Sequence, residues 1–159
     1  ENLKEAGIND VLIIANGLNL ARLINFVTIA KDFCSFPANI RFTEQKKLDH
    51  GMAGAILESK KFFNNEEILI ISSNDVVDID AYKLILEAAS NNDAAIIGYQ
   101  VHEYFPGGYL ETDENNFITN IIEKPKPGTQ PSNLINLVIH YFKNTFFYFL
   151  QHMGFFLFC

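Results

Sequence analysis

Strand-like and helix-like patterns alternate through the first part of the chain, and this alternation limits the possible folds more than any other feature. Short apolar runs such as Ile68–Ile71 are typical of strands that are covered on both faces. Between such runs, apolar residues recur at helical spacing, as Leu20, Leu23 and Val27 do. Strands that alternate with helices predict an α/β fold whose mostly parallel sheet is wrapped by crossover helices. We expect strands at Val11–Ala15, Ile40–Thr43, Ile68–Ile71 and Ala94–Val101, and helices at residues 1–6, 20–33, 51–62 and 81–90.

The pattern then changes to two strand-like runs, Gly108–Thr112 and Phe117–Glu123, and the Asp, Glu and Asn residues between them favour a hairpin turn. After a Pro-rich loop, the apolar run Leu134–Phe142 predicts one more strand. A short helix is expected near Asn144. The Phe-rich segment 143–159 is assigned to no element, and its apolar side chains would need a core or an interface to cover them.

Composition excludes several classes of protein. With 159 residues, 48% of them hydrophobic and 19% charged, the chain suits one globular domain over residues 1–159. A net charge of −7 without a basic cluster argues against a nucleic-acid surface. No apolar run reaches the roughly 18 to 20 residues of a membrane span. Two cysteines, Cys34 and Cys159, are too few for a disulfide framework, and a reducing cytoplasm fits best.

The first residues indicate a fragment. The chain has no starting Met, and Glu1–Ala6 has the pattern of the last turns of a helix that Gly7 ends. This polar start also lacks the features of a signal peptide. We therefore expect an N-terminally truncated domain.

Asp75 is the first candidate functional residue. The strand Ile68–Ile71 breaks at Ser72 and places Asp75 just beyond its carboxyl end, where ligands bind in open α/β sheets. A carboxylate there is a suitable ligand for Mg²⁺, which in turn binds phosphates. The alternative role for an acidic residue here is to cap the next helix, and that role is the expectation for Asp78 and Asp80.

Four motifs together resemble the sugar-phosphate nucleotidyltransferases, also called sugar-nucleotide pyrophosphorylases. Each is short and common, and the resemblance depends on their order and separation over about residues 1–142. They are Gln45 with Gly51-Met52-Ala53-Gly54-Ala55; Ile70-Ile71-Ser72-Ser73-Asn74-Asp75-Val76; Gly108-Tyr109-Leu110-Glu111 with the later Ile122-Glu123-Lys124-Pro125; and Ser132-Asn133-Leu134-Ile135-Asn136.

The resemblance implies a Rossmann-like, three-layer α/β/α domain, and it implies roles for the first two motifs. Gln45, Gly51 and Gly54 would contact the nucleotide base, although both glycines also suit tight helix–strand packing. Asp75 would bind Mg²⁺ and act in catalysis.

The third and fourth motifs are implied to bind the sugar 1-phosphate. Lys124 would supply a catalytic positive charge to its phosphate, with a solvated loop lysine as the alternative. Gly108, Glu123 and Asn136 would contact the sugar, although Gly108 also suits a turn or bulge and Asn136 could serve neighbouring backbone groups. His140, in the same strand, is expected to be a hydrogen-bonded core or edge histidine.

The implied reaction joins a nucleoside triphosphate to a sugar 1-phosphate and releases pyrophosphate. The family's Gly-rich phosphate loop and its second metal-binding Asp have no counterpart in the sequence, so we expect the isolated chain to have little or no transferase activity. A degenerate homologue that binds nucleotide or sugar phosphate, or that pairs with an active subunit, is the alternative. A related glycosyltransferase is a weaker one. A homo-oligomer is possible.

Overall fold

The computed structural model describes residues 1–64 and 66–144, so the segment 145–159 and any helix that begins after Asn144 lie outside the described residues. The described residues form two compact units. Unit 1 contains residues 1–67, 78–83 and the last residues before position 145; unit 2 contains residues 68–77 and 84–142. Of the helices in the described ranges, none combines the length and the apolar run needed to cross a bilayer.

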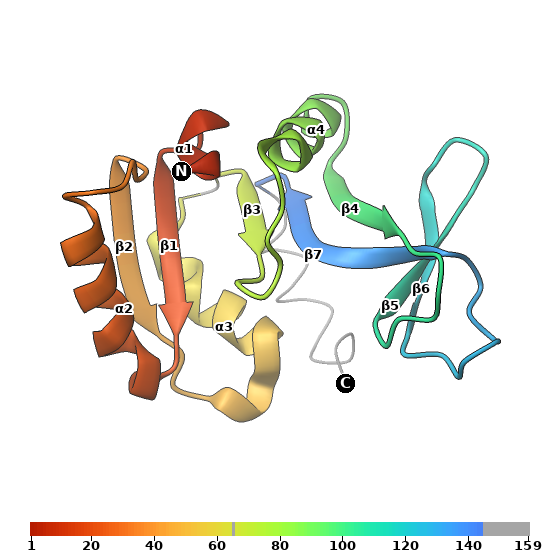
Figure 1. Cartoon of the computed structure of the whole chain (residues 1–159), viewed down its shortest axis with the longest axis horizontal. Helices are drawn as coiled ribbons and strands as arrows, with labels where there is room; N and C mark the ends of the chain where they lie inside the picture. The colour runs from red at the N-terminus through yellow and green to blue at the C-terminus, as the bar shows by residue number, and fades with distance from the viewer. Residues whose placement is uncertain (65, 145–159) are drawn as a thin grey trace. The chain divides into compact units, whose positions relative to one another are not determined.

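Unit 1 begins with one strand–helix–strand segment (Figure 1). After the short helix α1 (Asn2–Glu5), strand β1 (Asp10–Ala15) pairs in parallel with β2 (Asn39–Glu44), and helix α2 (Gly17–Ala30) connects them. Helix α2 starts where the Asn16 side chain accepts a hydrogen bond from the Asn19 N–H at 3.0 Å, which caps the first turn.

A second helical segment completes unit 1. Its elements are η1 (Leu48–His50), α3 (Gly51–Ser59) and η2 (Lys60–Phe62). Gly51, at the start of α3, has φ +54° and ψ −150°, a conformation that residues with a Cβ rarely adopt. The expected helix over residues 51–62 is therefore present, with a 3-10 turn as its last part.

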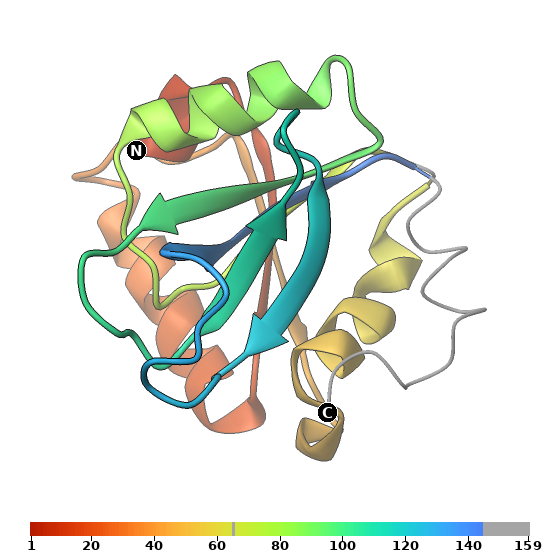
Figure 2. The same cartoon turned by 90° about the vertical axis from the view of Figure 1, so that its right-hand side faces the viewer.

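Unit 2 is organised around its last strand, β7 (Leu134–Phe142), which pairs along both edges (Figure 2). Strand β4 (Ala94–Gln100) occupies one edge. Strands β3 (Ile68–Ile71) and β5 (Gly108–Thr112) share the other edge of β7. The β7 residues with which they pair already have β4 along the first edge, so β3 and β5 must both lie on the opposite one. The hairpin partner of β5 is β6 (Ile118–Glu123).

The α/β fold predicted from the sequence is confirmed, but the pairing differs from the mostly parallel sheet that was expected. Within the described ranges only β1 and β2 pair in parallel. Strands β3 and β4 run in the same direction, yet both are antiparallel to β7, which lies between them. The sequence predicts the alternation of helices and strands. The insertion of β7 between β3 and β4 depends on tertiary contacts between residues far apart in the sequence.

One face of β7 forms the core of unit 2. Ile139 and Tyr141 pack with Ile85 and Ala89 of helix α4 (Ile79–Ala89) and with Ile97 of β4. Ile139 is fully buried. Alternate residues of a strand point to opposite faces, so the even-numbered residues of β7 lie on the other face of the sheet.

That other face carries a polar pair. The ring Nε2 of His140 and the side-chain Oδ1 of Asn136 are 2.8 Å apart. Burial lowers the pKa of His140 below its usual 6.5, and a backbone hydrogen bond at Leu137 only partly opposes this shift. His140 is thus held neutral beside an amide, which agrees with the expectation of a hydrogen-bonded histidine.

Replacing Ile139 by Ala should lower the free energy of unfolding of unit 2 by about 2–5 kcal/mol, because it leaves a cavity in a fully buried site. Urea denaturation followed by circular dichroism measures the change. Ile121→Ala on β6, where the side chain is 45% exposed, is the matched control and should cost clearly less. Equal losses for the two variants would contradict the assignment of the core.

The stability of unit 2 should fall as the pH drops below about 6.5. The folded-state pKa of His140 is lowered, so the unfolded chain binds the proton more readily; the stabilisation is complete above the unfolded pKa and is lost below it. Urea midpoints at about pH 7.5 and 5.5, compared with those of His140→Gln, test this expectation. An undiminished pH dependence in the variant would assign the effect to other groups.

Candidate functional site

The strongest candidate site lies in unit 2, on the edge of β7 that β3 and β5 share. On that edge, β5 pairs with Ile135 and β3 begins to pair at Ile139. Residues 136–138 of β7, which lie between these two positions, have no strand beside them on that edge. Asp75 lies near one end of this interval and Gly108 near the other. We call Asp75, Gly108, Glu123, Asn136 and His140 the β7 site.

Asp75 extends the hydrogen bonding of β3 by means of its side chain. The ladder ends with the Ser72 N–H, which donates to the Val138 carbonyl at 2.9 Å. Four residues after the strand ends, the Oδ2 of Asp75 accepts the N–H of Val138 at 3.3 Å. This bond fixes the half-buried carboxylate against β7, and its Oδ1 accepts no hydrogen bond from the described residues.

At Gly108, strand β5 lies close to side chains of both β6 and β7. A Cβ added at this buried glycine would lie 3.0 Å from the Oε2 of Glu123 and 3.7 Å from the Cβ of Asn136. Both neighbours were predicted from the sequence as sugar-binding residues. The structure therefore brings three of the predicted residues together around one backbone position.

Lys124 lies at the end of β6, beside this cluster. Its backbone has φ +44°, which is uncommon for a residue with a side chain, and its N–H donates to the Gly107 carbonyl at 3.1 Å. Its ammonium group is 3.8 Å from a Glu123 carboxylate oxygen, and both side chains are about two-thirds exposed. An exposed pair of this kind is weak and easily exchanged for another anion.

The three predicted base-binding residues lie in unit 1. The Gln45 amide donates to the Lys47 carbonyl at 3.1 Å and to the Gly51 carbonyl at 2.7 Å, and so closes the loop before α3. A Cβ on buried Gly54 would collide with the Cβ of His50, so Gly54 allows close helix–loop packing. A Cβ on Gly51 would meet nothing, and its role is the positive φ.

The same loop depends on Glu58, which sequence reasoning missed. Its carboxylate accepts the N–H groups of Lys46 at 2.9 Å and Lys47 at 3.3 Å. The hydrogen bond from Lys46 is the main reason that the pKa of Glu58 is lowered. In the sequence, Glu58 follows Lys46 and Lys47 by 12 and 11 positions, a spacing that by itself indicates no contact.

Acidic residues near Asp75 have separate roles. Asp80 lies in the first turn of α4, 3.8 Å from Lys83, and Asp78 accepts the Ala81 N–H through its carbonyl just before the helix. Among residues 1–64 and 66–144, no three His, Cys, Asp or Glu side chains come together as a metal-binding group. Asp75 alone fits as one ligand of a cation whose other ligands are phosphate oxygens and water.

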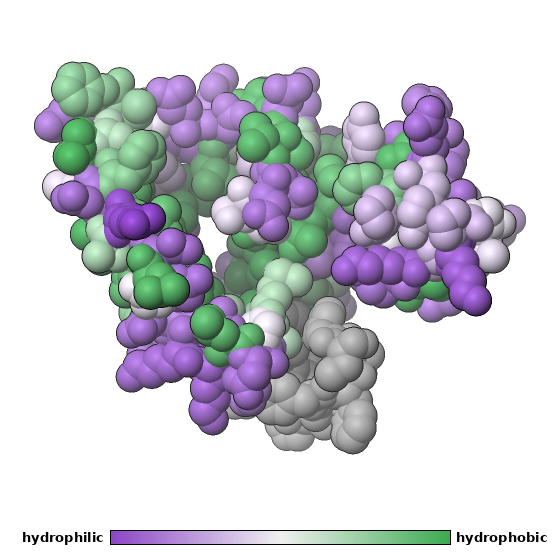
Figure 3. Space-filling model, turned by 60° about the horizontal axis from the view of Figure 1, so that its bottom comes forward, coloured by the Kyte–Doolittle hydropathy of each residue, from purple (hydrophilic) through white to green (hydrophobic). Residues whose placement is uncertain are grey.

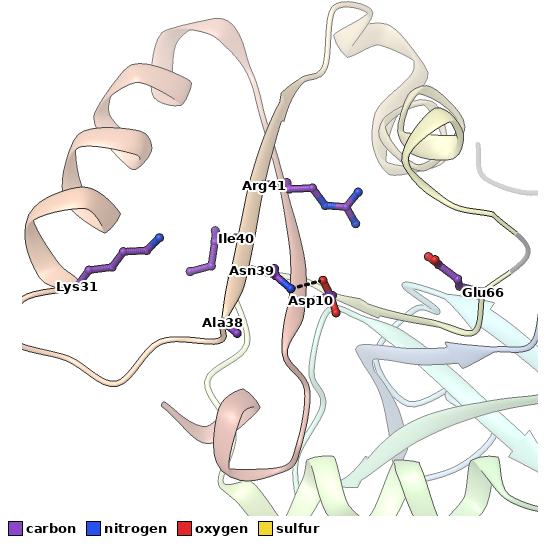
Figure 4. Close-up of a pocket in the computed structure, with 7 residues that line it drawn as sticks. All are labelled: Asp10, Lys31, Ala38, Asn39, Ile40, Arg41 and Glu66. Atoms are coloured by element: carbon purple, nitrogen blue, oxygen red, sulfur yellow. Dashed lines mark hydrogen bonds between the residues drawn. The ribbon is translucent and has the colours of Figure 1, made fainter.

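A separate hollow of about 520 Å³ opens in unit 1 beside the amino ends of β1 and β2 (Figure 4). The Asn39 amide donates to Asp10 at 2.9 Å at its floor. Arg41 is already engaged there, with a bond to the Phe62 carbonyl at 3.2 Å and its guanidinium 5.8 Å from the Phe62 ring centre. Ligands of open α/β sheets bind at the opposite, carboxyl ends of the strands, and no predicted site residue lines this hollow.

Comparison with protein families gives one match that spans almost the whole chain. The family model for nucleotidyl transferases matches residues 1–154. A bifunctional sugar-1-phosphate nucleotidylyltransferase/acetyltransferase of Sulfurisphaera tokodaii is 30% identical over 97% of this chain and 34% of its own length. A UTP–glucose-1-phosphate uridylyltransferase of Mycoplasma pneumoniae is 30% identical over 74% of this chain and 44% of its own. The chain thus spans less than half the length of these relatives.

Solved structures agree on the fold. A candidate glucose-1-phosphate thymidylyltransferase from Bacillus anthracis, crystallised with sucrose, aligns with 96% of this chain and 60% of its own at a TM-score of 0.80 and 20% identity. A UDP-glucose pyrophosphorylase in complex with UDP-glucose aligns with 95% of this chain and 64% of its own at a TM-score of 0.70 and 17% identity. Because the four motifs, the α/β fold and the family match agree along the chain, this protein belongs to the nucleotidyl transferase family.

Proposed function

We propose that this chain supplies part of the active site of a sugar-1-phosphate nucleotidyltransferase, which converts a nucleoside triphosphate and a sugar 1-phosphate to a nucleoside diphosphate sugar and pyrophosphate. The observation that carries the proposal is the β7 site. Residues predicted from three of the four motifs, Asp75, Gly108 with Glu123, and Asn136, come together along one edge of one strand. The two units are then parts of one nucleotidyltransferase domain, since one family model spans both.

The proposed reaction asks little covalent chemistry of the protein. A phosphate oxygen of the sugar 1-phosphate attacks the α-phosphorus of the triphosphate; a P–O bond forms to it, and the bond to the leaving pyrophosphate breaks. Catalysis of such a transfer depends on holding the two phosphates in line and on neutralising their charge. The proposed site residues are therefore assigned to positioning and to charge.

Asp75 is assigned to a divalent cation. Its carboxylate is fixed by the Val138 N–H, and this leaves Oδ1 for the cation. When bound, Mg²⁺ supplies positive charge to the phosphate oxygens. Asp75 by itself contributes one anionic ligand in a fixed orientation.

Lys124 and Glu123 are assigned to the sugar 1-phosphate. In the absence of ligand, the two side chains form an exposed pair. An incoming phosphate competes with Glu123 for the Lys124 ammonium group, and the freed carboxylate can accept a hydrogen bond from a sugar hydroxyl. Gly108 lets the sugar approach the backbone of β5, since a side chain there would meet Glu123.

Asn136 is assigned to a sugar hydroxyl, with its orientation set by His140. Of the two ring tautomers, the one that protonates Nε2 lets His140 donate to the Oδ1 of Asn136. The Asn136 amide N–H groups are then left to donate to the substrate. Gln45, Gly51 and Gly54 are assigned to the nucleotide base; the Gln45 amide already donates to two loop carbonyls, so its carbonyl oxygen is the group it can offer.

The alternative function is binding without catalysis, as a degenerate homologue or as the partner of an active subunit. Two observations favour it: the described residues place a single carboxylate at the proposed metal position, and they include no cluster of three metal-ligand side chains. Both readings predict ligand binding at the β7 site, and they differ in turnover.

We expect the isolated 159-residue chain to release pyrophosphate at a rate close to background. Removal of one donor that stabilises transition-state charge typically costs about 10² to 10³ in rate, and the sequence has no Gly-rich phosphate loop. A coupled pyrophosphate assay with several nucleoside triphosphates, glucose 1-phosphate and Mg²⁺ measures this rate. Robust release by the purified chain would overturn the expectation of low activity and would eliminate the non-catalytic alternative.

Asp75→Asn should weaken Mg²⁺-dependent binding of nucleoside triphosphate by at least about tenfold. The amide oxygen can still accept the Val138 N–H, so the variant removes charge and keeps the fold. Isothermal titration with and without Mg²⁺ measures the effect, and Asp78→Asn, at an exposed position before α4, is the matched control. Equal affinities for Asp75→Asn and the unaltered chain would remove Asp75 from the site.

A further inference from the structure

Helix α2 has a second apolar face that no other described residue of unit 1 covers. Its buried face includes Val27. On the opposite side, Leu18, Phe26, Ile29 and Phe33 are 86%, 64%, 59% and 84% exposed. Apolar side chains gather over this part of the molecule at the left of Figure 3.

These side chains form one continuous stripe along the helix. Together with Arg22 they follow at intervals of four, four, three and four residues, the spacing that keeps side chains on one face. Helical hydrogen bonding continues past Ala30, because the N–H of Cys34 donates to the Ala30 carbonyl at 2.8 Å. Phe33 therefore follows the helix as part of a hydrogen-bonded turn, close to the line of the stripe. We call Leu18, Arg22, Phe26, Ile29 and Phe33 the α2 stripe.

The charges beside the stripe are arranged for an antiparallel copy of the same helix. Arg22 lies five residues before Val27, and Asp32 lies five residues after it. Neither forms an ion pair with any residue in 1–64 or 66–144. When two copies of α2 pack antiparallel around a two-fold axis at the level of Val27, each Arg22 comes opposite Asp32 of the other copy, at the negative end of the partner helix.

We propose that this protein self-associates through the α2 stripe, as a two-fold symmetric pair of antiparallel helices. The side chains of Phe26 and Ile29 from the two copies meet near the axis and bury each other's apolar surface. Arg22 interrupts the apolar stripe because it faces Asp32 and Phe33 of the partner, an anion and an aromatic ring that both attract a guanidinium group.

The expected dimer is weak and reversible. The α2 stripe extends over a single helix face about 24 Å long, and one helix face is a small contact beside the roughly 800 Å² per partner that a standard stable interface buries. The α2 stripe and the β7 site share no residue, and they belong to different units. Self-association and ligand binding are thus independent predictions.

Sedimentation equilibrium of the full 159-residue chain over a range of concentrations tests the proposal. We expect a monomer–dimer equilibrium, and we expect Phe26→Lys to weaken association by at least about tenfold, since it places charge at the centre of the contact. Phe117→Lys is the matched control. The exposed fraction of Phe117, 61%, is similar to the 64% of Phe26, and Phe117 lies outside α2, so association should be unchanged.

Charge reversal identifies the orientation. Arg22→Glu should weaken association, and Arg22→Glu combined with Asp32→Arg should restore it, because the two charges exchange places across the axis. Both positions are exposed, and circular dichroism checks that each variant keeps its fold. A chain that stays monomeric at all concentrations, a dimer that survives Phe26→Lys, or a double variant without restored association would each overturn the proposal.

Discussion

Strand β7 is the constraint on which unit 2 depends, because it is hydrogen-bonded along both edges and has a different environment on each face. Its odd-numbered residues, among them fully buried Ile139, hold helix α4 and β4 in one core. Its even-numbered residues carry the Asn136–His140 pair. A strand that is fixed on two edges and one face is a rigid support, and rigid supports suit groups that must orient a ligand.

The sequence predicts the elements well and their pairing poorly, for a physical reason. The bounds of β5 and β7 follow directly from apolar runs that turn residues interrupt, and Gly7 ends α1 with the positive φ that a helix C-terminus requires. Local chemistry sets these limits. The position of β7 between β3 and β4 depends on contacts between residues far apart in sequence. The alternation of helices and strands does not predict such contacts.

The candidate site shows the same division. Asp75 was found from its place after a buried strand, and the structure adds its partner, Val138, which is 63 residues away. Asn136 was predicted either to bind a sugar or to serve backbone groups, and the structure adds a contact with His140, two strand periods further along the same face. Glu58 was missed because a helix carboxylate that accepts loop N–H groups has no sequence pattern of its own.

If Asp75 binds a cation as proposed, its bond with Val138 would link ligand occupancy to the backbone of β7. A side chain here takes the place that a strand carbonyl would fill in an ordinary ladder. A cation at the proposed Oδ1 position would draw electron density from the whole carboxylate and weaken the bond that Oδ2 accepts, so the Val138 amide and the ligand would share one carboxylate group. The exchange rate of that amide hydrogen would then report, from the backbone itself, whether the carboxylate holds a ligand.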